Sequence, residues 1–313
     1  MNKHDKIYVS GHRGMVGSAI MCELMHQGYD NIITRTHQEL DLTRQMDVES
    51  FFMNEKPDYV FLAAAKVGGI MANLQSPATF LYDNVIMEAN TINAAKESGV
   101  KKLLFLASSC IYPRMAPQPM REEYLMDGKV EPTNEGYAIA KITGLKLCEM
   151  YRRQYNADFI SVMPCNIFGY NDNYDPIASH VVPSLIRKIH IAKNQNAPYV
   201  ELWGSGNARR EFLFSEDLAN VCVFVMNTYS ETGFLNIGMG KDITIQNLAE
   251  LIREIVGFKG DIRFDPSKPD GMPQKLMDVS RITALGWRYT TDLAEGLQKT
   301  YAYYLTNQCS GRV

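Results

Sequence analysis

The chain contains 313 residues, of which 46% are hydrophobic and 21% are charged. These proportions are those of an ordinary globular protein, and the length favours one large domain with a smaller lobe. No apolar run approaches the roughly 18 residues that a membrane helix needs, and the polar start of the chain lacks the pattern of a signal peptide. We therefore expect a cytoplasmic protein with no membrane partner. The net charge of −3 offers no basic surface for nucleic acid.

The six cysteines are scattered without the pair spacing of a metal site. In a reducing compartment they also predict no disulfide framework. We expect no bound metal, and we interpret Cys22, Cys148 and Cys165 as structural residues.

Strands and helices are predicted to alternate along the first half of the chain. A short buried strand at 6–10 is followed by a glycine-rich turn and by a helix whose apolar residues are Val16, Ile20, Leu24 and Met25. Further strands are predicted, with helix-length segments between them, at 31–34, 59–64, 102–107 and 159–163. This alternation predicts an α/β fold, a Rossmann-type doubly wound parallel sheet with helices on both faces.

The composition changes after Gly169. Loops rich in Asn, Asp, Pro and Gly then separate shorter elements. We therefore expect a dinucleotide-binding domain at 1–170 and a smaller C-terminal α/β substrate lobe at 171–313, with an approximate boundary and with the two parts interleaved.

The glycine-rich turn carries the pattern G-x-x-G-x-x-G directly after the first strand. Glycine lets the backbone turn sharply and approach a pyrophosphate at the start of the following helix. Because a strand precedes the motif and a helix follows it, the motif predicts a dinucleotide cofactor. The residues that we expect to bind it here are Gly11, Arg13, Gly14, Met15, Val16 and Gly17.

The end of the second predicted strand indicates which dinucleotide binds. An acidic residue there would accept hydrogen bonds from the ribose hydroxyl of NAD, but this strand ends in Arg35. Together with Arg13, Arg35 would pair with a 2′-phosphate, which favours NADP(H). A solvated arginine at a strand end is the alternative, and Glu39 and Asp41 lie nearby in the sequence.

Tyr137 and Lys141 are spaced i,i+4, so a helix would place them on one face. An ammonium group near a tyrosine stabilises the phenolate, which makes such a pair useful for proton transfer to a carbonyl oxygen. The fourth strand ends in Ser108 and Ser109, and either hydroxyl would reach the same oxygen at the carboxyl edge of the sheet. A surface Tyr-Lys pair is the alternative interpretation.

These motifs together resemble the extended short-chain dehydrogenases/reductases over nearly the whole chain. The resemblance rests on the glycine turn, the strand end at 62–65, the serine pair, the Tyr137–Lys141 pair and the loop at 164–169. Four segments, 11–17, 64–69, 108–113 and 203–212, resemble the branch of this family that acts as a 3,5-epimerase-4-reductase on GDP-4-keto-6-deoxy-D-mannose. The resemblance implies a GDP-sugar substrate and NADPH.

Epimerisation beside a ketone needs a base that removes a proton and an acid that returns one on the opposite face. The resemblance assigns these roles to Cys110 and His180, and the reduction to Ser108, Tyr137 and Lys141. A thiolate is a competent base when a positive group lowers its pKa, and histidine titrates near neutrality. The residue types alone would favour a buried structural cysteine and a hydrogen-bonding structural histidine.

The resemblance also implies further binding residues. For the cofactor these are Asp41, Leu42, Ala64, Lys141, Pro164, Asn166, Ile167 and His180. For the substrate, Asp278 resembles a family contact, and Ser109 and Asn166 are further candidates. The diphosphate of the substrate needs cations, for which Lys188 and Arg210 are candidates, with Arg187 and Arg209 as neighbouring cations. Trp203 would lie against the base or the sugar. A solvated arginine face and a packed tryptophan are the alternatives at these positions.

The helix after Lys141 carries Leu147, Tyr151 and Tyr155 at helical spacing, which indicates a packing face. In the family this helix commonly joins a dimer interface, so the resemblance implies a homodimer.

Two other functions remain open. A sugar-nucleotide 4-epimerase or 4,6-dehydratase would use the same fold, although a dehydratase would ordinarily carry an acidic residue where Cys110 and Ile111 follow the serine pair. A non-catalytic dinucleotide sensor would not need the Ser, Tyr, Lys, Cys and His set.

Overall fold

The computed structural model describes residues 1–176, 178–268 and 270–309. Its larger sheet contains six parallel strands in the order β2-β1-β3-β4-β5-β9. The strands are β1 (Ile7–Ser10), β2 (Ile32–Ile33), β3 (Tyr59–Leu62), β4 (Lys102–Leu106), β5 (Phe159–Pro164) and β9 (Phe234–Ile237). The strand order reverses at β1, which has β2 on one side and β3 on the other, so a crevice opens at the carboxyl ends of β1 and β3.

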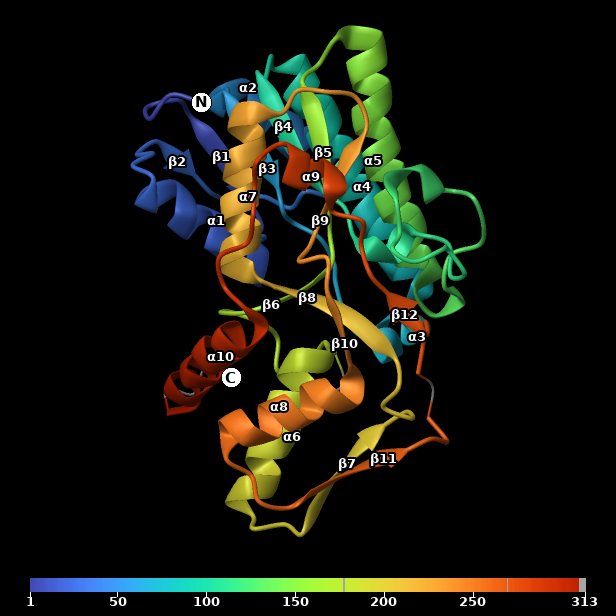
Figure 1. The fold of residues 1–313 in the computed structure, drawn as a ribbon. Helices are drawn as coiled ribbons and strands as arrows, with labels where there is room; N and C mark the ends of the chain where they lie inside the picture. Colours follow the sequence, from blue (N-terminus) through green and yellow to red (C-terminus); the bar gives the residue numbers. More distant parts are fainter. Residues whose placement is uncertain (177, 269, 310–313) are drawn as a thin grey trace.

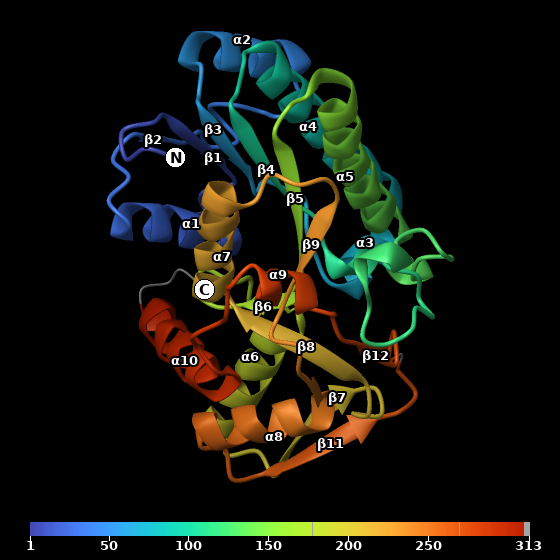
Figure 2. The same ribbon diagram turned by 45° about the horizontal axis from the view of Figure 1, so that its top comes forward.

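Helices cover both faces of this sheet (Figures 1 and 2). On one face α1 (Met15–His26) packs against α7 (Ser215–Thr228), and on the other lie α2 (Gln45–Glu55), α4 (Pro77–Glu97) and α5 (Glu135–Tyr155). The strands are almost entirely buried and read as continuous apolar runs, as expected for a parallel sheet covered on both sides. The predicted doubly wound α/β fold is confirmed.

The predicted strands agree with the observed ones except at their ends, and the second strand is only two residues long. In α1, Ile20 and Leu24 are fully buried, whereas the side chain of Met25 is 53% exposed. The prediction that Met25 belongs to the apolar face was therefore wrong. Adjacent helical residues are rotated by about 100°, so Leu24 and Met25 do not both face the core.

A second group of strands lies beyond the large sheet. Strand β8 (Arg209–Phe214) pairs with β6 (Asn166–Phe168) and β12 (Gln274–Lys275) in parallel and with β10 (Asp242–Thr244) in antiparallel orientation. A separate pair is formed by β7 (Tyr199–Trp203) and β11 (Asp261–Asp265). Helices α6 (Val181–Asn194), α8 (Ile245–Val256) and α10 (Leu293–Cys309) accompany these strands and enclose a second apolar cluster.

The residues at the two ends of α8 explain where the helix begins and ends. The Thr244 hydroxyl accepts a hydrogen bond from the Asn247 amide at 3.1 Å and caps the start of the helix. Gly257, with φ of +76°, ends it in the left-handed conformation that glycine tolerates best.

The chain passes repeatedly between the two groups of strands. Helix α7 and strand β9 lie after residue 170 in the sequence but complete the larger sheet and its helical layer, and α9 (Ser280–Ala284) packs beside β9. The boundary at residue 170 stays a prediction. Short elements complete the fold: α3 (Ile70–Gln75) and the 3₁₀ turns η1 (Ser109–Ile111), η2 (Glu122–Tyr124) and η3 (Pro132–Asn134). Among the described residues, no helix combines the length and apolar character needed to span a bilayer.

Candidate active site

The glycine-rich turn connects β1 to α1 at the carboxyl edge of the larger sheet (Figure 1). Gly11 has φ of +71°, and a Cβ atom on Gly17 would lie 2.2 Å from the carbonyl oxygen of Gly11. The turn therefore closes tightly onto the first turn of α1. Gly14 stands at the N-cap and has no side chain to cover the backbone N–H groups that follow. This cradle of backbone donors fits a pyrophosphate.

Two arginines lie beside the turn. Arg35 follows β2, and its guanidinium forms an ion pair with Glu55 at 2.5 Å. Arg13 and Arg35 both act on the exposed Glu39, whose pKa is lowered first by hydrogen bonds from Thr36 and then by these two charges. Two guanidinium groups near one exposed position are able to hold a phosphate dianion.

Other predicted cofactor residues surround this turn. Ala64 follows β3, and a Cβ atom on Gly11 would lie 2.8 Å from the Cα of Ala64, so the two backbones touch. Asp41 and Leu42 lie in the connection from β2 to α2. The Asp41 carboxylate accepts hydrogen bonds from the amide and hydroxyl of Thr43 at 2.9 and 2.7 Å, and Leu42 is buried. Their contacts with a cofactor stay predictions.

The predicted Tyr-Lys pair lies on one face of α5, as the i,i+4 spacing requires. The Lys141 ammonium is 5.9 Å from the centre of the Tyr137 ring and donates a hydrogen bond to the Leu106 carbonyl at 3.0 Å. Ser108 follows β4 and interacts through its hydroxyl with Tyr137. The structure thus brings Ser108, Tyr137 and Lys141 together at the carboxyl end of β4.

The electrostatics of Tyr137 differ from the prediction. Burial raises the pKa of Tyr137 well above its ordinary value, the charges of Cys110 and Glu88 raise it further, and only the Ser108 hydroxyl opposes them. We expected Lys141 to favour the phenolate. Instead its ammonium lies 3.1 Å from the buried carboxylate of Glu88, which offsets its charge. Tyr137 therefore keeps its proton, as a proton donor must. Glu88 was not identified from the sequence.

Cys110 lies in η1 and is almost fully buried. Burial raises the pKa of its thiol, against the opposing effects of the Lys275 charge, the Ser108 hydroxyl and the Lys141 charge, in that order. The expectation of a lowered thiol pKa was therefore wrong for the protein without ligands, because desolvation outweighs the nearby cations. The same Ser108 hydroxyl interacts with the thiol and with Tyr137.

Lys275 is a second residue that the sequence argument missed. It lies on β12, where it is the register partner of Arg210 on β8. Burial lowers the pKa of its ammonium, and Cys110, Glu131 and Cys165 oppose this while Arg210 adds to it. A cation thus lies close to Cys110.

His180 is the N-cap residue of α6. Its pKa is lowered, first because the surrounding protein displaces water from it and then because of the Lys275 charge. The preceding segment touches the loop after β3: the Gly69 amide donates to the Ala178 carbonyl at 3.0 Å, and a Cβ on Gly69 would lie 2.8 Å from the carbonyl oxygen of Ser179. Cys110 and His180 therefore share one charged neighbour, Lys275.

The loop after β5 holds the next group of predicted residues. Pro164 is the last residue of β5, and Asn166 and Ile167 lie in β6. The Asn166 side-chain amide donates to the Glu211 carbonyl at 2.7 Å, so it joins β6 to β8. Its predicted contacts with cofactor and substrate stay predictions.

Cations gather around Trp203 at the end of β7. The ring is 52% exposed, and the ammonium groups of Lys188 and Lys268 lie 5.6 and 5.9 Å from its centre. An exposed aromatic face flanked by two cations suits a nucleobase and its phosphates. Lys268 was not among the predicted residues.

The two adjacent arginines of β8 differ, because successive side chains of a strand point to opposite faces. Arg209 forms an ion pair with Asp242 on β10 at 2.6 Å. Arg210 donates to the carbonyls of Arg209 and Asp270 at 2.8 and 3.2 Å. Its remaining donors suit an anionic ligand.

Asp278 and Ser109 were also predicted to contact the substrate. The Asp278 carboxylate accepts a hydrogen bond from the Ser280 amide at 2.9 Å at the start of α9, and Arg121 lies 3.5 Å from its other oxygen. Ser109 is buried beside Cys110. A role in binding stays a prediction for both.

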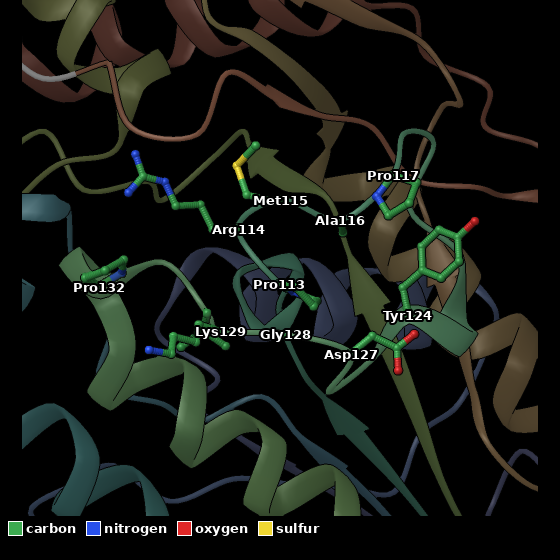
Figure 3. A pocket seen from close by; sticks show the side chains of 11 residues that line it. Pro113, Arg114, Met115, Ala116, Pro117, Tyr124, Asp127, Gly128, Lys129 and Pro132 are labelled. Atoms are coloured by element: carbon green, nitrogen blue, oxygen red, sulfur yellow. The ribbon is translucent and has the colours of Figure 1, made fainter.

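One hollow of the structure is lined by none of these residues. It measures about 560 Å³ and is lined by the segments 113–117 and 124–132, with Pro113, Pro117, Tyr124 and Pro132 around it (Figure 3). None of the residues predicted to act in binding or catalysis lines it. The predicted site residues therefore lie outside this hollow.

Residues 7–238 match the model of the NAD dependent epimerase/dehydratase family. The chain belongs to this family, a class of enzymes to which the doubly wound sheet, the glycine turn and the Tyr-Lys pair correspond.

Within the family, relatives with the name GDP-L-fucose synthase match nearly the whole chain. It is 55% identical to the putative GDP-L-fucose synthase 2 of Arabidopsis thaliana, covering 98% of this chain and 94% of that protein. It is 50% identical to the GDP-L-fucose synthase of Escherichia coli, covering 97% of each. Among solved structures, a GDP-L-fucose synthetase from Naegleria fowleri bound to NADP superposes with a TM-score of 0.92 at 28% identity, covering 100% of this chain and 98% of that one.

Proposed function

We propose that the chain catalyses the reaction of a GDP-L-fucose synthase. GDP-4-keto-6-deoxy-D-mannose is epimerised at carbons 3 and 5 and is then reduced at carbon 4 with NADPH to give GDP-L-fucose. The observation that carries the proposal is the match to GDP-L-fucose synthases, which are 50–55% identical to this chain over nearly its whole length. The 3₁₀ turn that holds Cys110 directly follows Ser108 and packs against α5, the helix of Tyr137, so the groups for the epimerisation and the reduction lie close to one another.

The cofactor is NADP(H), as in the solved relative from Naegleria fowleri. The backbone donors after Gly14 would hold its pyrophosphate, and the guanidinium groups of Arg13 and Arg35 would hold its 2′-phosphate. When bound, it supplies a hydride to carbon 4.

Tyr137 acts in the reduction as the proton donor to the oxygen at carbon 4. Its raised pKa keeps it protonated at neutral pH, and the Ser108 hydroxyl is placed to hydrogen-bond the same oxygen. Lys141 fixes the geometry through its hydrogen bond to the Leu106 carbonyl. The proton lost by Tyr137 is regained from solvent.

Cys110 and His180 carry out the epimerisation. One of them removes the proton from the carbon beside the ketone, which leaves an enolate, and the other returns a proton to the opposite face of that carbon. The bonds that break and form are carbon–hydrogen bonds, so no net oxidation occurs. Lys275 lies near both groups and favours negative charge there, on the thiolate or on the enolate.

The GDP moiety would lie along the second group of strands. Trp203 offers an aromatic face to the base, and Lys188, Lys268 and Arg210 are placed to neutralise the diphosphate.

We also propose a homodimer formed through α4 and α5. Large apolar side chains are exposed on these two helices: Tyr82 by 65%, Ile139 by 41%, Met150 by 45% and Tyr155 by 47%. Exposed apolar groups on adjacent helices favour self-association. Sedimentation of the protein, and of a variant with Met150→Glu, tests the dimer. The cytoplasmic location stays a prediction.

The first experiment mixes the protein with GDP-4-keto-6-deoxy-D-mannose and NADPH. We expect one NADPH to be oxidised per product molecule, with the product in the L-fuco configuration. A 4-epimerase or a 4,6-dehydratase would regenerate its cofactor, and a non-catalytic sensor would oxidise none. Absence of NADPH consumption would therefore refute the proposal.

The second experiment separates the two half-reactions with Cys110→Ser. We expect slower exchange of solvent deuterium at carbons 3 and 5, while a ketone that is already epimerised is still reduced. Cys148→Ser, which removes a buried thiol on α5, is the matched control and should leave both rates unchanged. Equal loss of exchange and reduction in Cys110→Ser would contradict the division of labour.

A further inference from the structure

A buried ion pair joins α4 to the Tyr-Lys pair of α5. The Glu88 carboxylate lies 3.1 Å from the Lys141 ammonium, and the two side chains are only 1% and 3% exposed. Lys141 is held from a second side by the Leu106 carbonyl at 3.0 Å. The ammonium is therefore fixed between a strand end and a carboxylate.

The packing of α4 against α5 is adapted to this carboxylate. A Cβ atom on Gly144 would lie 2.5 Å from Oε2 of Glu88 and 2.5 Å from Cζ of Phe105. Only a residue without a side chain allows the two helices to approach here with Glu88 between them. A second position of the chain, Gly144, thus leaves the space that the carboxylate occupies.

A carboxylate buried in this place costs folding free energy, which indicates that it has a function. Burial raises the pKa of Glu88, and the Lys141 charge is the largest effect that opposes this. The packing could be satisfied by an apolar or amide side chain of similar size. An amide, however, would not offset the charge of Lys141 close to the Tyr137 hydroxyl.

We propose that Glu88 is a positioning residue of the reduction: its carboxylate holds the Lys141 ammonium and limits how much of that positive charge acts on Tyr137. An unopposed ammonium would favour the phenolate, whereas a reductase needs Tyr137 protonated. Glu88 thus contributes, after burial and the neighbouring Cys110, to the upper end of the pH range in which Tyr137 is able to donate its proton. The proposal rests on the proposed function, because it assigns Tyr137 the role of acid.

The test compares Glu88→Gln with the unaltered protein. The amide keeps the shape and removes the charge. We expect the decline of the reduction rate at high pH to move to lower pH, measured with NADPH and the epimerised ketone. In the protein without ligands, the titration of Tyr137, followed by NMR with ¹³Cζ-labelled tyrosine and assigned with Tyr137→Phe, should move in the same direction by a similar amount.

Three further variants control for structural effects. Glu88→Asp keeps the charge and should keep the pH profile even if the rate falls. Glu122→Gln removes another buried carboxylate, which binds the Asn236 amide at 3.0 Å, and should move neither curve. Gly144→Ala pushes against the Glu88 carboxylate and should move both curves in the direction of Glu88→Gln, so the proposal can be tested even if the amide variant does not fold.

A Tyr137 titration that is unchanged in both Glu88→Gln and Gly144→Ala would overturn the proposal. This readout needs no substrate. If the unaltered protein oxidises no NADPH, the proposed function fails on that result alone, and the titration still decides whether Glu88 controls the charge at Tyr137.

Discussion

Replacement of Gly17 by alanine tests the tight closure of the glycine turn. The added Cβ would lie 2.2 Å from the Gly11 oxygen and 2.6 Å from the Gly11 carbonyl carbon. Both distances are shorter than 3.0 Å, the closest approach that Cβ atoms normally make to other heavy atoms. Both atoms belong to the backbone, so no flexible side chain is able to move away. Overpacking of this kind costs roughly 3 kcal/mol, which for a chain of 313 residues corresponds to a fall in Tm of about 5 °C.

The turn must open to accept the methyl group, and this displaces the backbone donors that would hold the pyrophosphate. We expect NADPH to bind at least about tenfold more weakly, a loss of about 1.4 kcal/mol. Tm is measured by circular dichroism and binding by NADPH fluorescence. Gly14→Ala is the matched control for stability, because its Cβ would meet only the Gly11 oxygen at 3.4 Å. A Gly17→Ala protein with the Tm and NADPH affinity of the unaltered protein would refute this account of the turn.

Three other predictions follow from charges in the structure. Arg35→Asp should raise the KM for NADPH at least about tenfold and change that for NADH much less, because only the former carries the 2′-phosphate; an equal change would contradict the assignment. Lys275→Met should move the pH dependence of Cys110 alkylation by iodoacetamide to higher pH, since the Lys275 charge favours the thiolate; a shift to lower pH would exclude this role. Burial raises the pKa of Asp172 from 3.8 to about 7. The folded state therefore binds more protons than the unfolded state between these values, and stability falls as pH rises through this window. Asp172→Asn should remove that fall, so its Tm should exceed that of the unaltered protein at pH 8 but not below pH 4; identical profiles would show that Asp172 does not titrate in this way.

The parallel sheet and the Tyr-Lys pair could be predicted because they depend on local patterns. Apolar runs with helix-length spacers predict parallel strands, and an i,i+4 spacing places Tyr137 and Lys141 on one face whatever surrounds them. Glu88 was missed because its partner lies 53 positions later, on another helix. A signal did exist: Asn84, Glu88 and Thr91 fall on the buried stripe of an otherwise apolar helix face, and a polar residue at a core position indicates a specific partner.

The state of Cys110 could not be predicted for a different reason. The sequence shows that a thiol follows the serine pair, but its pKa depends on burial and on Lys275, which strand pairing brings in from far along the chain. Desolvation and long-range cations act in opposite directions, and their balance is set only by the folded structure. The same holds for Arg209 and Arg210, whose different partners follow from the pairing of β8 with β10 and β12.

The position of β9 limits where the chain can be cut into fragments that fold separately. A fragment that ends at residue 170 would lack β9, and β5 would become the edge of the sheet. The backbone N–H and C=O groups of β5 that face β9 would then be unpaired along a fully buried run that is apolar except for Ser161. Such an edge is a template for aggregation. We therefore expect a fragment that ends at residue 170 to aggregate, because β9 and α7 complete the sheet and its helical layer.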